Sequence, residues 1–130
     1  MEDKVFSSLI QVVRSMVLEG RCPWMRRQSL LSITESLTEE CQEFSEAVVE
    51  AKPKKEVISE AGDVLTLTLA LCFLLEREGM CSVGEIINEA IAKLRRRAPY
   101  IFQEGAHPVS IEEAAYLWEL AKCKEKENQE

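Results

Sequence analysis

The sequence lacks several features that assign a chain quickly to a protein class. Only 6% of its 130 residues are aromatic, it contains a single histidine, and its net charge is −7. A nucleic-acid surface needs a basic patch, which this acidic balance argues against. A nucleotide ligand is still allowed, because a bound metal ion reverses the charge of an acidic site. We therefore expect no nucleic-acid partner, whereas a small nucleotide is still a possible ligand.

Cysteine pairs and long apolar runs are also missing. The cysteine count of five is odd, no CxxC pair occurs, and Cys41 and Cys72 fall inside apolar helical patterns. This distribution favours reduced thiols in a cytoplasmic protein. The N-terminus does not have the layout of a signal peptide, and the apolar run at 64–75 is shorter than the ~20 residues that cross a bilayer. We expect no membrane partner.

Helical patterning is what the sequence does contain. Leu, Ala, Val and Ile dominate, and no segment alternates with a period of two. Breaks rich in Gly and Pro predict helices over roughly 4–19, from about 29 to the break at 52–55, from about 55 to 79, from about 82 to 98, and from 110 onward. Ser110 and Glu113 have the spacing of a capping box. We predict a single all-α domain over 1–130, an antiparallel bundle of four to five helices, with a frayed charged tail at 123–130.

The second helix places a carboxylate where an apolar residue is expected. Its apolar stripe consists of Ile33, Leu37, Cys41, Phe44, Val48 and Ala51. At ~100° per residue, Glu40 falls inside this stripe and Glu43 on its edge, whereas other acids of the helix point away and are read as solvated surface. The third helix repeats the pattern, because Glu60 and Asp63 share a face and open a run that avoids charge. That run should be buried on all sides.

Buried carboxylates that converge are costly unless a cation lies between them. Oxygen ligands select hard ions, so we predict magnesium, with manganese as a substitute. A di-iron bundle is excluded because it requires Glu-x-x-His on two helices. The single histidine, His107, is predicted in a loop and is read as solvated.

Several motifs resemble those of the MazG nucleotide pyrophosphohydrolases. Glu39-Glu40-Cys41-Gln42-Glu43 followed by Glu60-Ala61-Gly62-Asp63 is similar to the family's EExxE…ExxD signature. Cys22-Pro23-Trp24 with Gln28, the segment 93–102 (KLRRRAPYIF), and Trp118-Glu119 with Lys122 match further family motifs in the same order. The resemblance covers roughly residues 5–127.

The resemblance implies an all-α enzyme that converts a nucleoside triphosphate and water to the monophosphate and pyrophosphate. It assigns the metal to Glu40, Glu43, Glu60 and Asp63, and we interpret Glu39 as the group that orients or deprotonates the attacking water. Lys93, Arg96 and Arg97 are candidates for phosphate binding, although cations at a helix C-terminus are also favourable without a ligand. Trp24 and Tyr100 are candidates for stacking on a base, and each is also a plausible packing residue.

Three departures from the family pattern affect recognition and not the metal ligands. The usual Asp after CPW is Met25, an H-P-H triplet reads Ala98-Pro99-Tyr100, and a common Asn is Ile91. The base and sugar therefore stay open, between a nucleotide-pool housecleaning enzyme and a relative specialised for one nucleotide. The alternative from another class is a non-catalytic helical dimer that binds nucleotides or regulates. In either case the apolar third helix predicts a homodimer or homotetramer.

Overall fold

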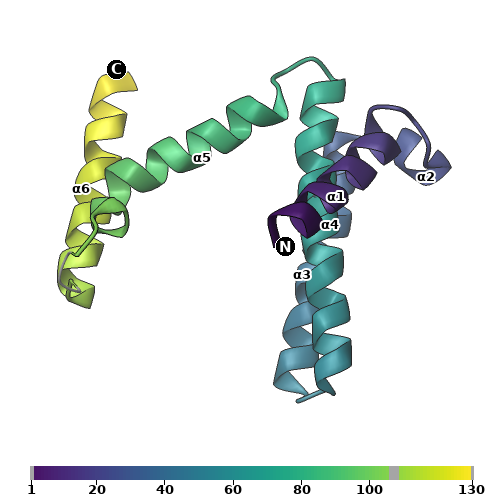
Figure 1. The fold of residues 1–130 in the computed structure, drawn as a ribbon, viewed down its shortest axis with the longest axis horizontal. Helices are drawn as coiled ribbons and strands as arrows, with labels where there is room; N and C mark the ends of the chain where they lie inside the picture. Colours follow the sequence, from purple (N-terminus) through teal and green to yellow (C-terminus); the bar gives the residue numbers. More distant parts are fainter. Residues whose placement is uncertain (1, 106–108, 130) are drawn as a thin grey trace. The chain divides into compact units, whose positions relative to one another are not determined.

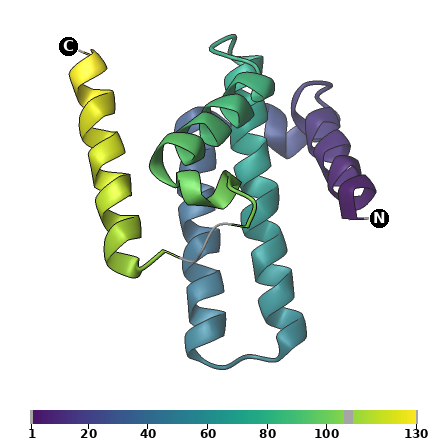
Figure 2. The same cartoon turned by 60° about the vertical axis from the view of Figure 1, so that its left-hand side comes forward.

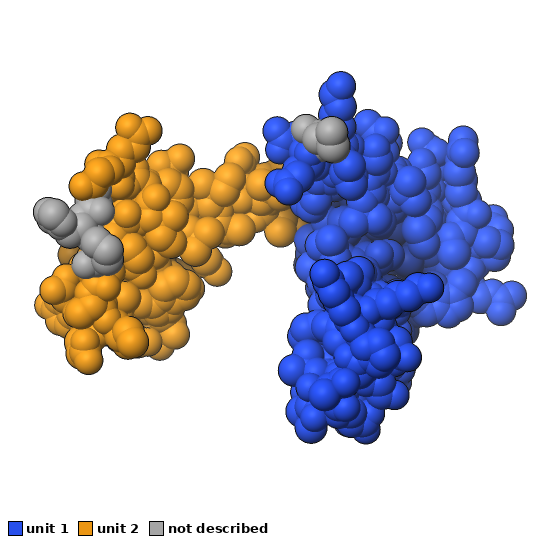
Figure 3. Space-filling model, turned by 60° about the horizontal axis from the view of Figure 1, so that its bottom comes forward, with its two compact units in different colours: residues 1–83 blue, residues 84–130 orange. Residues whose placement is uncertain are grey.

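The computed structural model describes residues 2–105 and 109–129, and within these residues every regular element is a helix (Figure 1). The order is α1 (Glu2–Val17), α2 (Pro23–Arg26), α3 (Leu30–Val49), α4 (Lys54–Arg77), α5 (Val83–Arg97), the 3₁₀ helix η1 (Pro99–Phe102) and α6 (Ile111–Gln129). The all-α prediction is confirmed. The chain divides into two compact units, Met1–Val83 and Gly84–Glu130, coloured separately in Figure 3. The single-domain expectation stays a prediction.

Most helix ends fall where the sequence predicts them, and side-chain caps explain two of them. Ser29 precedes α3, and its hydroxyl accepts a hydrogen bond from the backbone of Ser32 at 3.0 Å, while the Ser32 hydroxyl accepts one from the Ser29 backbone at 2.8 Å. This is a reciprocal capping box. At α6 the Ser110 hydroxyl accepts from the Glu113 backbone at 3.1 Å, which confirms the predicted cap.

Three segments differ from the sequence prediction. The Cys22–Trp24 break contains the helical turn α2, because Pro23 has the backbone angle that a first helical position needs. The looser stretch after Pro99 begins with the 3₁₀ turn η1. The tail predicted to fray over 123–130 is helical as far as Gln129, and Glu125 within it is held by ion pairs to α5.

In the first unit, α3 and α4 form an antiparallel hairpin, and α1 packs against α4 (Figures 1 and 2). The core gathers apolar side chains from α1, α2, α3 and the second half of α4: Val13, Val17, Met25, Ile33, Ala70, Phe73 and Leu74. Because this core lies toward one end of the hairpin, the first half of α4 and the facing part of α3 are free to carry polar groups.

The predicted stripe of α3 is rotated relative to the buried face. Cys41 and Val48 are exposed, whereas Ala47 is 4% exposed, and Ala51 lies beyond the helix with φ 52° in the turn to α4. The face toward α4 thus runs from Ile33 past Glu40 to Ala47, which keeps Glu40 inside it.

The prediction that α4 is buried on all sides is wrong for the single chain. Only Ala70, Phe73 and Leu74 of the helix are buried, and Leu65 is 42% exposed. The reason is that α1 and α3 cover part of its circumference and leave another apolar face open. Helix α4 is also long and apolar enough to pass a length-and-composition test for a membrane span, a test that core helices of globular proteins pass as well.

Candidate metal centre

Three carboxylates converge between α3 and α4. Glu40 from α3 and Glu60 and Asp63 from α4 each present an oxygen, and these oxygens lie within 4.8 Å of one another. Glu60 and Asp63 are three residues apart and therefore share one face of α4, which the hairpin turns toward Glu40. The hairpin thus brings together three of the four predicted ligands.

The fourth predicted ligand, Glu43, lies at the edge of the cluster. Its carboxyl group lies close enough to Glu40 and Glu60 to raise the pKa of both, yet Glu43 is exposed. It also lines a second hollow of about 140 Å³, which is rich in acids and contains Lys52. The Lys52 ammonium lies 3.6 Å from Glu50 and 4.0 Å from Glu56, so its charge is directed to those residues.

The cluster is electrostatically unfavourable without a cation. Burial, followed by the charges of Glu43 and its neighbours, raises the pKa of Glu40 above its ordinary value. The same causes raise the pKa of Glu60. In addition, Oε2 of Glu40 and Oε2 of Glu60 are buried and have no hydrogen-bond partner among the described residues. Buried oxygens of this kind are destabilising unless a proton or a metal ion satisfies them.

The donor set fits a hard divalent cation. All the converging atoms are carboxylate oxygens, which suit magnesium or manganese better than zinc. The two unpartnered Oε2 atoms supply ligand positions that no protein group occupies in the part of the chain described. The residues present therefore fit the ion that the sequence predicts.

A pocket of about 360 Å³ opens beside the cluster. Its walls come from α2, α3 and α4 and consist of Trp24, Ser36, Glu39, Glu40, Asp63, Thr66 and Leu67. Glu39 faces this pocket together with the carboxylates, although sequence analysis placed it off the apolar stripe. Ser36 and Thr66 were not predicted as site residues. Their positions one helical turn from Glu40 and Asp63 are the signal that could have found them.

The predicted phosphate-binding residues lie in the second unit, and two of the three are already paired there. Arg96 Nε donates to Glu125 Oε1 and Arg97 Nη2 donates to Glu125 Oε2, both at 2.8 Å. The Arg97 guanidinium also lies 5.3 Å from the ring centre of Trp118. Lys93 is exposed, and Tyr100 in η1 is half-buried. His107 lies outside the described residues.

The fold and the cluster together define an all-helical protein with converging carboxylates between two antiparallel helices. Comparison with known proteins gives the family. The MazG nucleotide pyrophosphohydrolase domain matches residues 28–102, a stretch that contains α3, α4 and all four acids. The chain belongs to the MazG family.

Individual relatives agree with this assignment. The uncharacterized protein YabN of Bacillus subtilis is 31% identical over 99 residues, which are 76% of this chain and 20% of that protein. The nucleoside triphosphate pyrophosphohydrolase/pyrophosphatase MazG of Thermotoga maritima is 29% identical over 101 residues, 78% of this chain and 39% of that protein. The chain thus spans well under half the length of these relatives.

A solved structure is similar over most of the chain. The crystal structure of a mazG-related protein from Thermotoga maritima has a TM-score of 0.78 and 27% sequence identity, and the match covers 89% of this chain and 97% of that one. The predicted family and fold class are both confirmed.

Proposed function

We propose that this protein is a magnesium-dependent nucleoside triphosphate pyrophosphohydrolase, which converts a ribo- or deoxynucleoside triphosphate and water to the monophosphate and pyrophosphate. One observation carries the proposal. Oxygens of Glu40, Glu60 and Asp63 converge, and Oε2 of Glu40 and of Glu60 has no hydrogen-bond partner among the described residues. Glu40 and Asp63 line a pocket whose other walls include the carboxylate of Glu39 and the aromatic ring of Trp24. Family membership supports the same reaction.

Each acidic residue has a distinct role in this proposal. Glu40, Glu60 and Asp63 hold the metal ion, and Glu43 completes the set from the edge. When bound, the ion neutralises charge on the phosphate oxygens, the main requirement of phosphoryl transfer. Glu39 is exposed and lines the same pocket, so its carboxylate is available to orient the attacking water and accept its proton.

The substrate contacts fall into two groups. Trp24 is 49% exposed at the pocket, which supports stacking on a base. Lys93 is the most available phosphate ligand, because it makes no ion pair within the described residues, whereas Arg96 and Arg97 must exchange Glu125 for phosphate. We retain these three cations and Tyr100 as candidate substrate contacts.

We assign the activity to nucleotide-pool housecleaning in the cytoplasm. The non-catalytic alternative, a helical module that binds nucleotides or regulates, is disfavoured because a chain without catalysis has no need to keep unpartnered buried carboxylates. The Met25 departure is compatible with activity, since Met25 is a fully buried core residue and leaves Trp24 at the pocket.

Self-association is the second part of the proposal. The side chains of Val5, Phe6, Leu9 and Leu65, with Glu2, line an apolar groove of about 430 Å³ on the first unit. Phe6 is 50% exposed and Val5 67% exposed. Contiguous apolar surface of this kind marks an interface, so we propose a homodimer or homotetramer. Light scattering should give at least a dimer at micromolar concentration, and Phe6→Asp should weaken it; a monomeric wild-type protein would refute this part.

The deciding experiment is pyrophosphate release from a panel of eight NTPs and dNTPs with magnesium. We expect release that requires magnesium and is lost in Glu40→Gln. The matched control is Glu35→Gln, on an exposed position of the same helix, which should keep wild-type activity. Folded protein that releases no pyrophosphate from any of the eight substrates would place the non-catalytic alternative first.

A further inference from the structure

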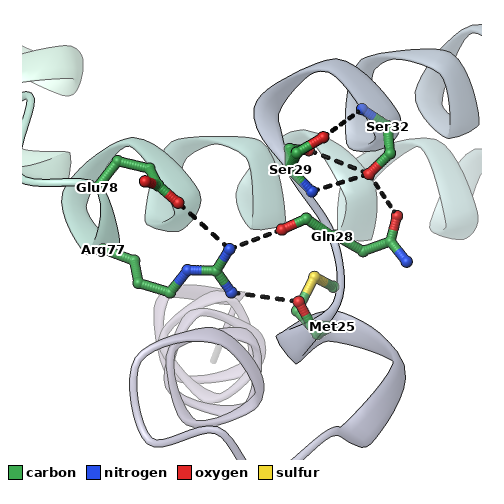
Figure 4. Close-up of polar contacts among 6 residues, drawn as sticks. All are labelled: Met25, Gln28, Ser29, Ser32, Arg77 and Glu78. Atoms are coloured by element: carbon green, nitrogen blue, oxygen red, sulfur yellow. Dashed lines mark hydrogen bonds and ion pairs between the residues drawn. The ribbon is translucent and has the colours of Figure 1, made fainter.

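An arginine at the end of α4 holds the turn that carries Trp24. Arg77 Nη1 donates to the carbonyl oxygen of Met25 at 3.2 Å, and Arg77 Nη2 donates to the carbonyl oxygen of Gln28 at 2.7 Å (Figure 4). The partners are 52 and 49 residues away in sequence, so the contact is purely tertiary. The Arg77 side chain is only 26% exposed.

The turn needs such a contact because α2 is too short to be stable alone. A helix of one turn leaves its last carbonyl groups without helical partners, and an isolated helix of this length does not persist in water. The Arg77 guanidinium satisfies one carbonyl of α2 and one just after it, and its positive charge suits the negative end of a helix.

A second anchor comes from the start of α3. Gln28 Nε2 donates to the carbonyl oxygen of Trp24 at 3.2 Å, and Gln28 Oε1 accepts from the Ser32 hydroxyl at 2.7 Å. The Ser32 hydroxyl belongs to the capping box of α3 (Figure 4). Arg77 therefore joins α4 to a turn that is already tied to α3, and these are the two helices that carry the acids.

The consequence falls on Trp24. The next residue, Met25, has a fully buried side chain and a carbonyl held by Arg77. Because these two contacts fix the backbone beside Trp24, the Trp24 ring stays half-exposed at the wall of the acidic pocket. Without the Arg77 contact, only local hydrogen bonds and the Met25 side chain would hold the turn.

We propose that Arg77 is a positioning residue that fixes α2 so that Trp24 forms one wall of the substrate pocket. The proposal rests on the proposed function in taking Trp24 as a substrate contact. Arg77 does not itself line the pocket, so it acts through Trp24. Its loss should weaken substrate binding more than the chemical step.

Steady-state kinetics on Arg77→Met, Trp24→Ala and the double variant test this coupling. We expect Arg77→Met to raise KM about tenfold, because a loosened turn weakens the contact of Trp24 with substrate, and to change kcat by less than about twofold. In the Trp24→Ala background, Arg77→Met should change KM by less than about twofold, because Arg77 affects substrate binding only through Trp24. A full additional effect in that background, or a fall in kcat with KM unchanged, would overturn the proposal.

Two further variants keep the test decisive. Arg27→Met removes an exposed charge from the same turn and should leave KM within about twofold; an equal rise would mean that charge, and not position, is responsible. Arg77→Lys keeps the charge without the planar pair of donors and should raise KM by an intermediate factor. If Arg77→Met does not fold, Arg77→Lys carries the kinetic test against Trp24→Ala.

Fluorescence provides a readout that does not depend on catalysis. In a Trp118→Phe background Trp24 is the remaining tryptophan, and Arg77→Met should increase its quenching by acrylamide about twofold or more while circular dichroism stays unchanged. Unchanged quenching would overturn the positioning role even in an active enzyme. Increased quenching in a protein that hydrolyses none of the eight nucleotides would support the positioning role and refute the proposed function alone.

Discussion

Carboxylates occupy half-buried positions in both units, but in opposite electrostatic settings. In the first unit Glu40 and Glu60 face other acids, their pKa values are raised, and each has a buried oxygen without a hydrogen-bond partner in the part of the chain that the structure describes. In the second unit Glu125 receives one hydrogen bond from Arg97 and one from Arg96, which lower its pKa to about 2. The first set is incomplete without a cation, whereas the second is complete within the chain.

This difference distinguishes carboxylates that are suited to bind a ligand from carboxylates that only stabilise the fold. A carboxylate between two guanidinium groups stabilises the contact of α5 with α6 and needs no ligand. Converging carboxylates oppose folding of their own hairpin, and such a cost is typical of a binding site. The same contrast applies to the three candidate phosphate ligands at 93–97. Glu125 already neutralises two of them, Arg96 and Arg97, so their charge alone does not indicate a phosphate site.

The largest effect on catalysis should come from Glu39→Gln. Removing a general base lowers kcat by roughly 10² to 10⁴-fold, whereas the three converging ligands remain. The variant should therefore lose pyrophosphate release yet keep its thermal response to magnesium. Activity within a few-fold of wild type would show that Glu39 does not activate the water.

Magnesium should stabilise the first unit strongly. At a hundredfold excess over Kd, the ion adds about 2.7 kcal/mol to the free energy of unfolding, on the order of 10 °C in Tm. Asp63→Asn should abolish the rise, whereas Glu125→Gln should retain it. Differential scanning calorimetry with and without magnesium measures both, and an equal rise in Asp63→Asn would place the ion elsewhere.

Glu125→Gln should destabilise the second unit without touching the first. Both 2.8 Å hydrogen bonds lose their charged acceptor. The Tm of this unit should therefore fall by about a few degrees. Trp118 reports the transition, because its ring lies beside Arg97. The measurement is made in Trp24→Phe, and an unchanged Trp118 melting curve would contradict the structural role of Glu125.

The smallest effects should appear in the pH dependence of stability, with opposite signs in the two units. The raised pKa values of Glu40 and Glu60 mean that the folded metal-free protein holds protons more tightly than the unfolded chain, so stability falls as pH rises above about 4.5 through those values. Glu125 contributes stability above about 4.5 that is lost as pH falls toward 2.

Two substitutions separate these contributions. Glu60→Gln should flatten the fall in Tm as pH rises above about 4.5 and should stabilise the metal-free protein at neutral pH. Glu125→Gln should instead flatten the loss of stability below about pH 4.5. Thermal melts in a chelating buffer over both ranges give the comparison, and a destabilised Glu60→Gln at neutral pH would contradict it.

Sequence periodicity predicted the acid cluster because helices fix the spacing of neighbours. Glu40 inside an apolar face and Glu60 three residues before Asp63 are local patterns, and one hairpin brings them together. Glycine and proline predicted most helix ends because both residues break helices through local backbone effects. The stripe of α3 was rotated because Cys41 and Val48 are apolar residues that the single chain leaves exposed.

Tertiary contacts were beyond the reach of local patterns. Arg77 reads in sequence as a favourable cation at a helix C-terminus, and only the tertiary fold brings its guanidinium to the Met25 and Gln28 carbonyls. Likewise, nothing near Glu125 in the sequence indicates that two arginines 28 and 29 residues earlier are its partners.

Direct binding of Mn²⁺, followed by the loss of its free electron paramagnetic resonance signal, tests the central claim that the cluster of Glu40, Glu60 and Asp63 is a cation site. We predict saturable binding that magnesium displaces, that Asp63→Asn abolishes and that Glu125→Gln leaves unchanged. Equal Mn²⁺ binding by wild type and Asp63→Asn, or no binding by the folded wild-type protein, would contradict the account.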